Sequence, residues 1–161
     1  MATKNDFSAS EWDLLRKTPL TASLIVVAAS PSGPIGLLKE SAAASKMMLS
    51  AASASQSPLL NALTEDLRRN VALPELPRTA DPAQLRASAM ETIKASAALL
   101  GSKASVEETQ EFRQWLMKIA QATAEATREG GFLGFGGTQV SGEEQAALAD
   151  LHEALGLPKA A

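Results

Sequence analysis

Cysteine is absent from this chain of 161 residues, and histidine occurs once. The lack of cysteine excludes disulfide bridges, thiolate nucleophiles and cysteine-ligated zinc or iron–sulfur clusters. The lone His152 excludes the paired Glu-x-x-His motifs of di-iron bundles and the His-Glu-x-x-His motif of zinc proteases, because both need a second histidine. We therefore expect no metal and no cofactor, and no motif identifies a catalytic residue.

Basic charge is also scarce. The formal net charge is −3, and no block of lysine and arginine could neutralise a run of phosphates. Nucleic acid is therefore not an expected partner. The longest apolar run, residues 20–29, lies between Pro19 and Pro31 and is shorter than the ~20 residues of a membrane span. No apolar signal-peptide core follows Met1, so the chain is expected to be cytoplasmic.

Alanine and leucine make up most of the hydrophobic residues. Hydrophobic residues make up 45% of the chain, whereas aromatic residues make up 4% and tyrosine is missing. Alanine and leucine are strong helix formers, so the composition predicts an all-α fold. The length fits a compact, single-domain helical bundle over residues 1–161. Two prolines predict a stiff linker over residues 73–80, between halves that are each too small for an independent core.

Local signals predict about seven helices with short connections. Capping-box spacings at Ser8–Glu11, Asp81–Gln84, Ser105–Glu108 and Ser141–Glu144 mark four helix starts, and prolines open the other helices. The run Leu24–Val27 could also form a strand, but no second run of this kind exists to pair with it. The predicted helices cover approximately residues 9–17, 19–30, 34–54, 58–71, 82–100, 106–129 and 142–155.

The stretch Gly130–Gly137 holds five of the ten glycines and two of the four phenylalanines. Each glycine costs about 1 kcal/mol against alanine inside a helix, so the stretch is predicted to be a loop. Its amides could cradle an anion, but it lacks a complete nucleotide-binding fingerprint and an acidic helix start follows it. Two interpretations remain. Phe132, Leu133 and Phe135 form an apolar plug on the bundle, or they contact a partner or a small ligand.

Two tryptophans and several methionines form a second candidate contact set. Trp12, Met47, Met48, Trp115 and Met117 could line an apolar pocket between helices. Large apolar residues at helical spacing are more often part of the core. Met47 and Met48 could instead belong to an interface, since methionine adapts to irregular surfaces.

His152 and its sequence neighbour Asp150 are the one polar pair that could polarise an imidazole or hold a weakly bound metal. A surface histidine near a helix C-terminus is the simpler interpretation, because its positive form is favoured there. Carboxylates also cluster at residues 107–111 and 143–144. Each cluster lies at a helix start, where capping and the helix dipole favour acidic residues without any catalytic role.

Three segments carry a resemblance to a family of small bacterial all-helical proteins with a GGFLGFGG loop. They are residues 11–15, 29–36 and 129–137, the last followed by Val140 and Ser141. The resemblance implies a bacterial source and a helical fold, and it transfers no functional residues. The seven-helix layout is also similar to that of TerB-type tellurite-resistance domains, but the acidic metal motifs of those domains are missing, so this analogy concerns the fold alone.

The sequence favours a non-enzymatic, cytoplasmic, helical interaction protein with a homo-oligomer or another protein as partner. Alanine-rich helix faces and the apolar glycine loop suit such contacts. The alternative is a small-molecule-binding or stress-response module with an apolar pocket between helices under the loop 130–137. An enzyme is the third hypothesis, and it would have to rely on His152 with a carboxylate.

Overall fold

The computed structural model describes residues 1–29, 46, 57–69, 81–128 and 140–158. These residues form five α-helices and one short 3₁₀ helix, and they contain no strand. The all-α prediction is confirmed, whereas the predicted number of seven helices is not matched. The elements are η1 Lys4–Asp6, α1 Ala9–Val27, α3 Pro58–Arg69, α4 Pro82–Lys103, α5 Val106–Arg128 and α6 Gly142–Ala154.

One reason for the difference lies in α1, which joins the two helices predicted over residues 9–17 and 19–30. Pro19 lies inside α1 and is buried, not at a helix start. An interior proline costs about 3 kcal/mol, since it removes one hydrogen bond and clashes with the preceding turn. Leu15 and Ile25, on either side of Pro19, are fully buried, and each such side chain contributes roughly 1.5–3 kcal/mol. The shared buried stripe therefore outweighs the local penalty.

The second reason is that the helix predicted over residues 34–54 lies outside the described residues, apart from Lys46. The linker predicted over residues 73–80 and the glycine loop of residues 130–137 also lie outside them.

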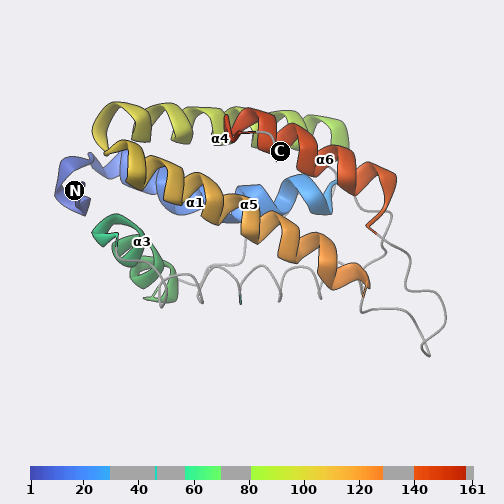
Figure 1. The fold of residues 1–161 in the computed structure, drawn as a ribbon, viewed down its shortest axis with the longest axis horizontal. Helices are drawn as coiled ribbons and strands as arrows, with labels where there is room; N and C mark the ends of the chain where they lie inside the picture. The colour runs from blue at the N-terminus through green and yellow to red at the C-terminus, as the bar shows by residue number, and fades with distance from the viewer. Residues whose placement is uncertain (30–45, 47–56, 70–80, 129–139, 159–161) are drawn as a thin grey trace.

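Helix α1 is the centre of the described structure and contacts α3, α4, α5 and α6. It passes behind α5 in Figure 1, with α4 and α6 along the upper side and α3 at the lower left. One hydrophobic cluster joins these helices, and it includes side chains from both sides of residues 73–80. Its fully buried large side chains are Leu15, Ile25, Leu59, Leu63, Ile93, Leu100, Phe112, Leu116, Ile119, Leu151 and Leu155.

Helix starts follow the local signals closely. In α1 the Ser8 hydroxyl accepts a hydrogen bond from the Glu11 amide, and the Glu11 carboxylate accepts one from the Ser8 amide. The same reciprocal pairs occur at Ser105–Glu108 before α5 and at Ser141–Glu144 before α6. Before α4, Asp81 accepts from the Ala83 amide. Four predicted caps are therefore present in the structure.

The end of α4 differs from the prediction, which placed it before Gly101. The helix continues to Lys103, and the Ala104 amide still donates to the Leu100 carbonyl. Leu100 is fully buried, so packing holds this last turn despite the roughly 1 kcal/mol that glycine costs in a helix.

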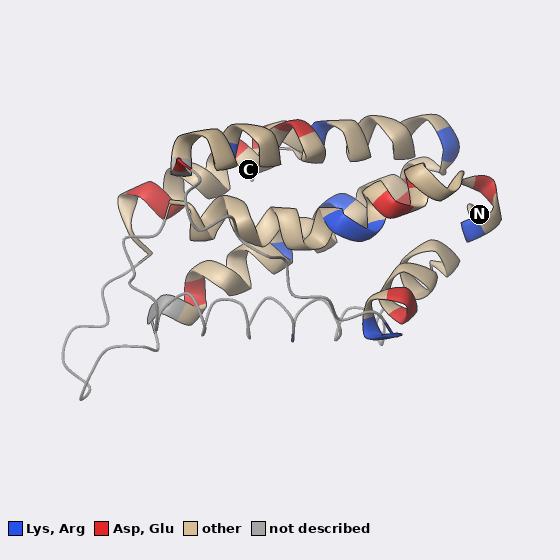
Figure 2. Cartoon of the chain, turned by 180° about the vertical axis from the view of Figure 1, so that it is seen from behind, with Lys and Arg blue, Asp and Glu red and all other residues tan. Residues whose placement is uncertain are grey.

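Acidic and basic residues are interspersed along the helices that are visible from behind (Figure 2). Among the described residues, no helix combines the length and the apolar character that crossing a membrane requires.

Candidate functional site

Five of the predicted contact residues lie outside the described residues: Met47, Met48, Phe132, Leu133 and Phe135. The plug and contact interpretations of the glycine loop therefore both stay predictions. The remaining candidates lie on α1, α5 and α6.

Trp12 and Trp115 are both in the hydrophobic core, 5% and 3% exposed. The Trp12 indole nitrogen donates to Asp66 Oδ2 at 2.6 Å, and its ring lies 6.0 Å from that of Phe7. The Lys4 ammonium, and after it the Trp12 indole, lower the pKa of the Asp66 carboxyl. Trp115 packs edge-on against Phe112 at 5.9 Å. Each indole therefore has a structural role in its own part of the core.

The predicted polar pair is not assembled. Asp150 forms an ion pair with Arg86 of α4, which fastens α6 to α4. His152 is half-buried on α6 and faces a hollow between α5 and α6. Because Asp150 already has a cationic partner, an acid–base pair between these two residues gains no support.

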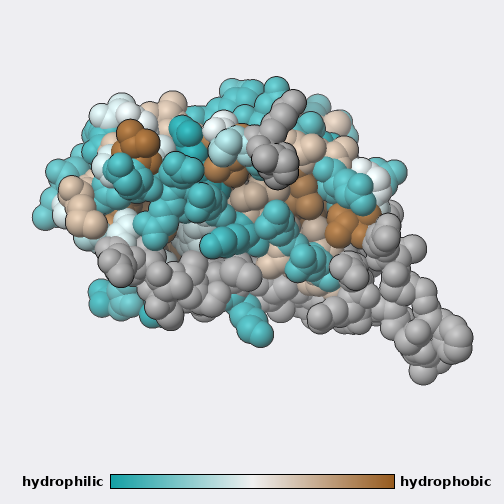
Figure 3. Space-filling view, viewed as in Figure 1, coloured by the Kyte–Doolittle hydropathy of each residue, from teal (hydrophilic) through white to brown (hydrophobic). Residues whose placement is uncertain are grey.

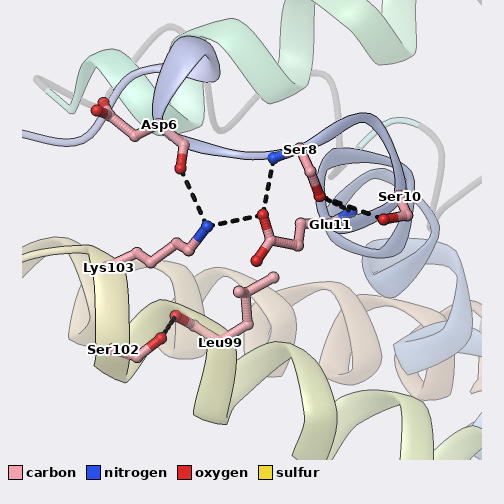
Figure 4. Close-up of polar contacts among 7 residues, drawn as sticks. All are labelled: Asp6, Ser8, Ser10, Glu11, Leu99, Ser102 and Lys103. Carbon is pink, nitrogen blue, oxygen red and sulfur yellow. Dashed lines mark hydrogen bonds and ion pairs between the residues drawn. The ribbon is translucent and has the colours of Figure 1, made fainter.

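A second polar cluster joins the end of α4 to the start of α1. Lys103 donates to Glu11 Oε2 at 2.7 Å and to the Asp6 carbonyl at 3.2 Å (Figure 4). The hydrogen bond from Lys103, followed by those from Ser8, lowers the pKa of Glu11 to about 2. Every charge in this cluster has a partner and a structural task, so we assign it no chemistry.

Among the described residues, four buried side-chain atoms have no hydrogen-bond partner: Arg16 Nε, Thr109 Oγ1, Arg113 Nε and Trp115 Nε1. The second and third belong to residues that line a hollow of about 390 Å³, which we call the α5 hollow. It is bounded by the end of α4, the first half of α5 and the turn that follows α6. Gly101 and Ala104 line it from the side of α4. The remaining lining residues are Val106, Thr109, Gln110, Arg113, Gly156, Leu157 and Pro158.

Two polar atoms in side chains that line the α5 hollow are buried without a hydrogen-bond partner, although Arg113 as a whole is half-buried. Among the described residues, neither the Thr109 hydroxyl nor the Arg113 Nε has one. Thr109 is 6% exposed. A buried polar group that stays unpaired costs about 1–3 kcal/mol. Two such groups in one hollow lower the stability of the protein unless a partner satisfies them.

The turn after α6 forms one wall of the α5 hollow. Gly156 has a positive φ of 61°, its amide donates to the Glu153 carbonyl, and the Leu157 amide donates to the His152 carbonyl. This pair of bonds is a Schellman motif, which closes a helix and redirects the chain. A Cβ atom at Gly156 would stand 3.6 Å from Arg113 Nη1. The turn therefore brings Leu157 and Pro158 beside Arg113.

Gly156→Ala is expected to lower the free energy of unfolding by about 1–2 kcal/mol, because alanine is strained at positive φ. Urea unfolding followed by circular dichroism would measure the change. Gly101→Ala is the matched control, because Gly101 lies inside α4 with no atom within 4 Å of the added carbon. This control should raise stability by about 0.5–1 kcal/mol. Equal effects of the two variants would contradict the assigned turn.

A second hollow, of about 670 Å³, lies between α5 and α6, and we call it the α6 hollow. Leu157 lines both hollows, so they adjoin. In the space-filling view, apolar surface recurs along the line between α5 and α6, interrupted by polar residues (Figure 3). The residues that line the α6 hollow are Met117, Gln121, Leu148, Ala149, His152, Glu153 and Leu157.

Thr109, Gln110 and Arg113 were not among the residues predicted from the sequence to form a site. A signal for them exists, because residues three and four apart share one helix face. Val106, Thr109, Gln110, Arg113, Met117 and Gln121 follow this spacing beside the buried stripe of α5. Only the return of Leu157 shows that this face borders a hollow.

Within the described ranges, no group of three or more histidine and acidic side chains could hold a metal ion. No protein-family model, no curated protein and no solved structure matches the chain. The resemblance to a bacterial helical family therefore stays a prediction.

Proposed function

We propose that this chain is a binding protein that holds a small organic anion in the α5 hollow. The observation that supports the proposal is the pair of buried, unpartnered polar groups, Thr109 Oγ1 and Arg113 Nε. Both are hydrogen-bond donors, and both atoms are covered by the protein surface, so an acceptor oxygen reaches them when the surrounding side chains move. A carboxylate supplies two such oxygens, and arginine matches its planar geometry.

The charge of the lining agrees with an anion. Arg113 is the one residue of the α5 hollow with a formal charge, and no ion pair engages it within the part of the chain that the structure describes. Ala104, Val106 and Leu157 are apolar residues in the same lining.

An interaction or oligomerising role stays a prediction with less structural support. In the described ranges, the large apolar side chains that are exposed are Met1 and Val106. Two side chains provide little of the continuous apolar surface that a stable interface uses. Binding of a small molecule in the α5 hollow is therefore the better-supported function. It belongs to the same class as the small-molecule alternative that the sequence offered, although the hollow lies elsewhere than under residues 130–137.

Calorimetric titration with sodium hexanoate tests the proposal, with the melting temperature as a second readout. We expect saturable binding and a rise in melting temperature with ligand concentration. Arg113→Gln should weaken binding by about tenfold or more, since a hydrogen bond to a charged group contributes roughly 1.5–3 kcal/mol.

Arg69→Gln is the matched control. It makes the same charge change on α3, where Arg69 pairs with Glu65 in solvent, so it should leave hexanoate affinity unchanged. No saturable binding at millimolar hexanoate, or equal weakening in both variants, would overturn the proposal.

A further inference from the structure

The ligand can be specified further, and this step rests on the function proposed above. We infer that it is a medium-chain carboxylic acid, with its carboxylate at Arg113 and Thr109 and its hydrocarbon chain along the α6 hollow. The first support is continuity, because Leu157 belongs to the lining of both hollows. A molecule bound at Arg113 can extend past Leu157 without leaving the protein surface.

The second support is the change in character from one hollow to the other. Beyond Leu157, the half-buried side chains of Met117 and Leu148 face the α6 hollow. Methionine and leucine favour a hydrocarbon chain, and methionine adapts to its shape.

The third support is the placement of charge. The α5 hollow carries the cation Arg113, whereas the α6 hollow carries the carboxylate Glu153. An anionic head group is attracted to the first and repelled by the second. The charges therefore fix the direction of the ligand, with its head at the start of α5 and its tail toward the middle of the helix.

The fourth support is length. From Arg113 to Gln121 the axis of α5 rises roughly 12 Å, about the extended length of a ten-carbon chain. Arg113 lines the α5 hollow, and Gln121 is the α5 residue farthest along the helix in the lining of the α6 hollow. A chain much shorter would leave Met117 and Leu148 uncovered, and a chain much longer would project into solvent.

Calorimetric titration with the sodium salts of butanoic, hexanoic, octanoic and decanoic acids, each below its micelle concentration, tests the inference. Affinity should rise by about twofold to fourfold per added methylene, the upper value applying to complete burial. Met117→Gln should flatten this dependence while butanoate affinity stays the same. Met90→Gln is the matched control, since Met90 is half-buried on α4 and lines neither hollow.

The outcomes separate this inference from the proposed function. If all four acids bind with one affinity that depends on Arg113, the anion site stands and the tail assignment is wrong. A chain-length dependence that Met117→Gln leaves intact also overturns the tail assignment. If no acid binds, or if 1-octanol binds as tightly as octanoate, the anion site itself is wrong.

Discussion

Phe112→Ala is expected to lower the free energy of unfolding by about 3–5 kcal/mol, the usual cost of truncating a buried aromatic residue. Phe112 is fully buried, and its ring lies 5.9 Å from that of Trp115 in an edge-on arrangement. The substitution removes the packing of a whole ring and one aromatic pair, and the surrounding helices collapse only in part. Urea unfolding, followed by circular dichroism and by tryptophan fluorescence, would measure the loss.

Two controls define what the loss means. Phe112→Leu keeps most of the side-chain volume. It should lower the free energy of unfolding by less than about 1.5 kcal/mol, as volume-conserving changes in a core usually do. Val106→Ala changes an apolar residue on the same helix that is 76% exposed, and it should stay within about 0.5 kcal/mol of the unchanged protein. If Phe112→Ala were as mild as Val106→Ala, α5 would not contribute its buried face to the core.

The starts of the helices could be predicted from the sequence because the chemistry that sets them is local. A cap needs only a hydroxyl and a carboxylate three residues apart, as at Ser8–Glu11 and Ser141–Glu144. The buried stripe of α5 was also predictable, since Phe112 and Ile119 repeat with the helical period and are fully buried.

Prediction from local rules was wrong where tertiary packing outweighs a local preference. Pro19 normally opens a helix, yet here it lies within one. The Thr18 hydroxyl donates to the Leu14 carbonyl at 2.8 Å, which adds a contact in the turn that the proline interrupts. Burial on both sides of Pro19 decides the outcome, and burial depends on α4 and α5, which are far away in sequence.

The candidate site was beyond prediction for a related reason. The sequence places Arg113 at the border between the buried and exposed faces of α5 and gives no sign that it belongs to a site. It lines a hollow only because the Gly156 turn returns the chain beside it. A hydrophobic pattern sorts residues by burial, but it does not say which distant segment arrives next to them.

Glu108→Ala is the second substitution for which we expect a large effect, a loss of about 2–4 kcal/mol. Glu108 is 3% exposed, and both of its carboxylate oxygens lie 3.0 Å from the Ala2 amide. The same carboxylate accepts a hydrogen bond from the Ser105 amide at 3.1 Å and so completes the cap of α5. Removing it leaves the amide of the buried Ala2 unpaired, at a cost of about 1–3 kcal/mol. It also removes the capping interaction at the exposed Ser105, whose usual contribution is about 0.5–2 kcal/mol.

Glu107→Ala is the matched control, because Glu107 is the preceding acidic residue of the same helix turn and is exposed. It should cost only about 0.3–1 kcal/mol, because the interactions of Glu107 with the first-turn amides, with Ser105 and with the helix dipole are all at the exposed surface. Glu108→Gln should fall between the two, since its amide oxygen can still accept one hydrogen bond. Urea unfolding would give the energies, and amide exchange by NMR should be faster at Ala2 and Ser105 in Glu108→Ala. If Glu108→Ala matched Glu107→Ala in both measurements, the acidic cluster at this helix start would act through the dipole alone. A difference between them would show that one carboxylate of this cluster, that of Glu108, fastens the N-terminal segment to α5.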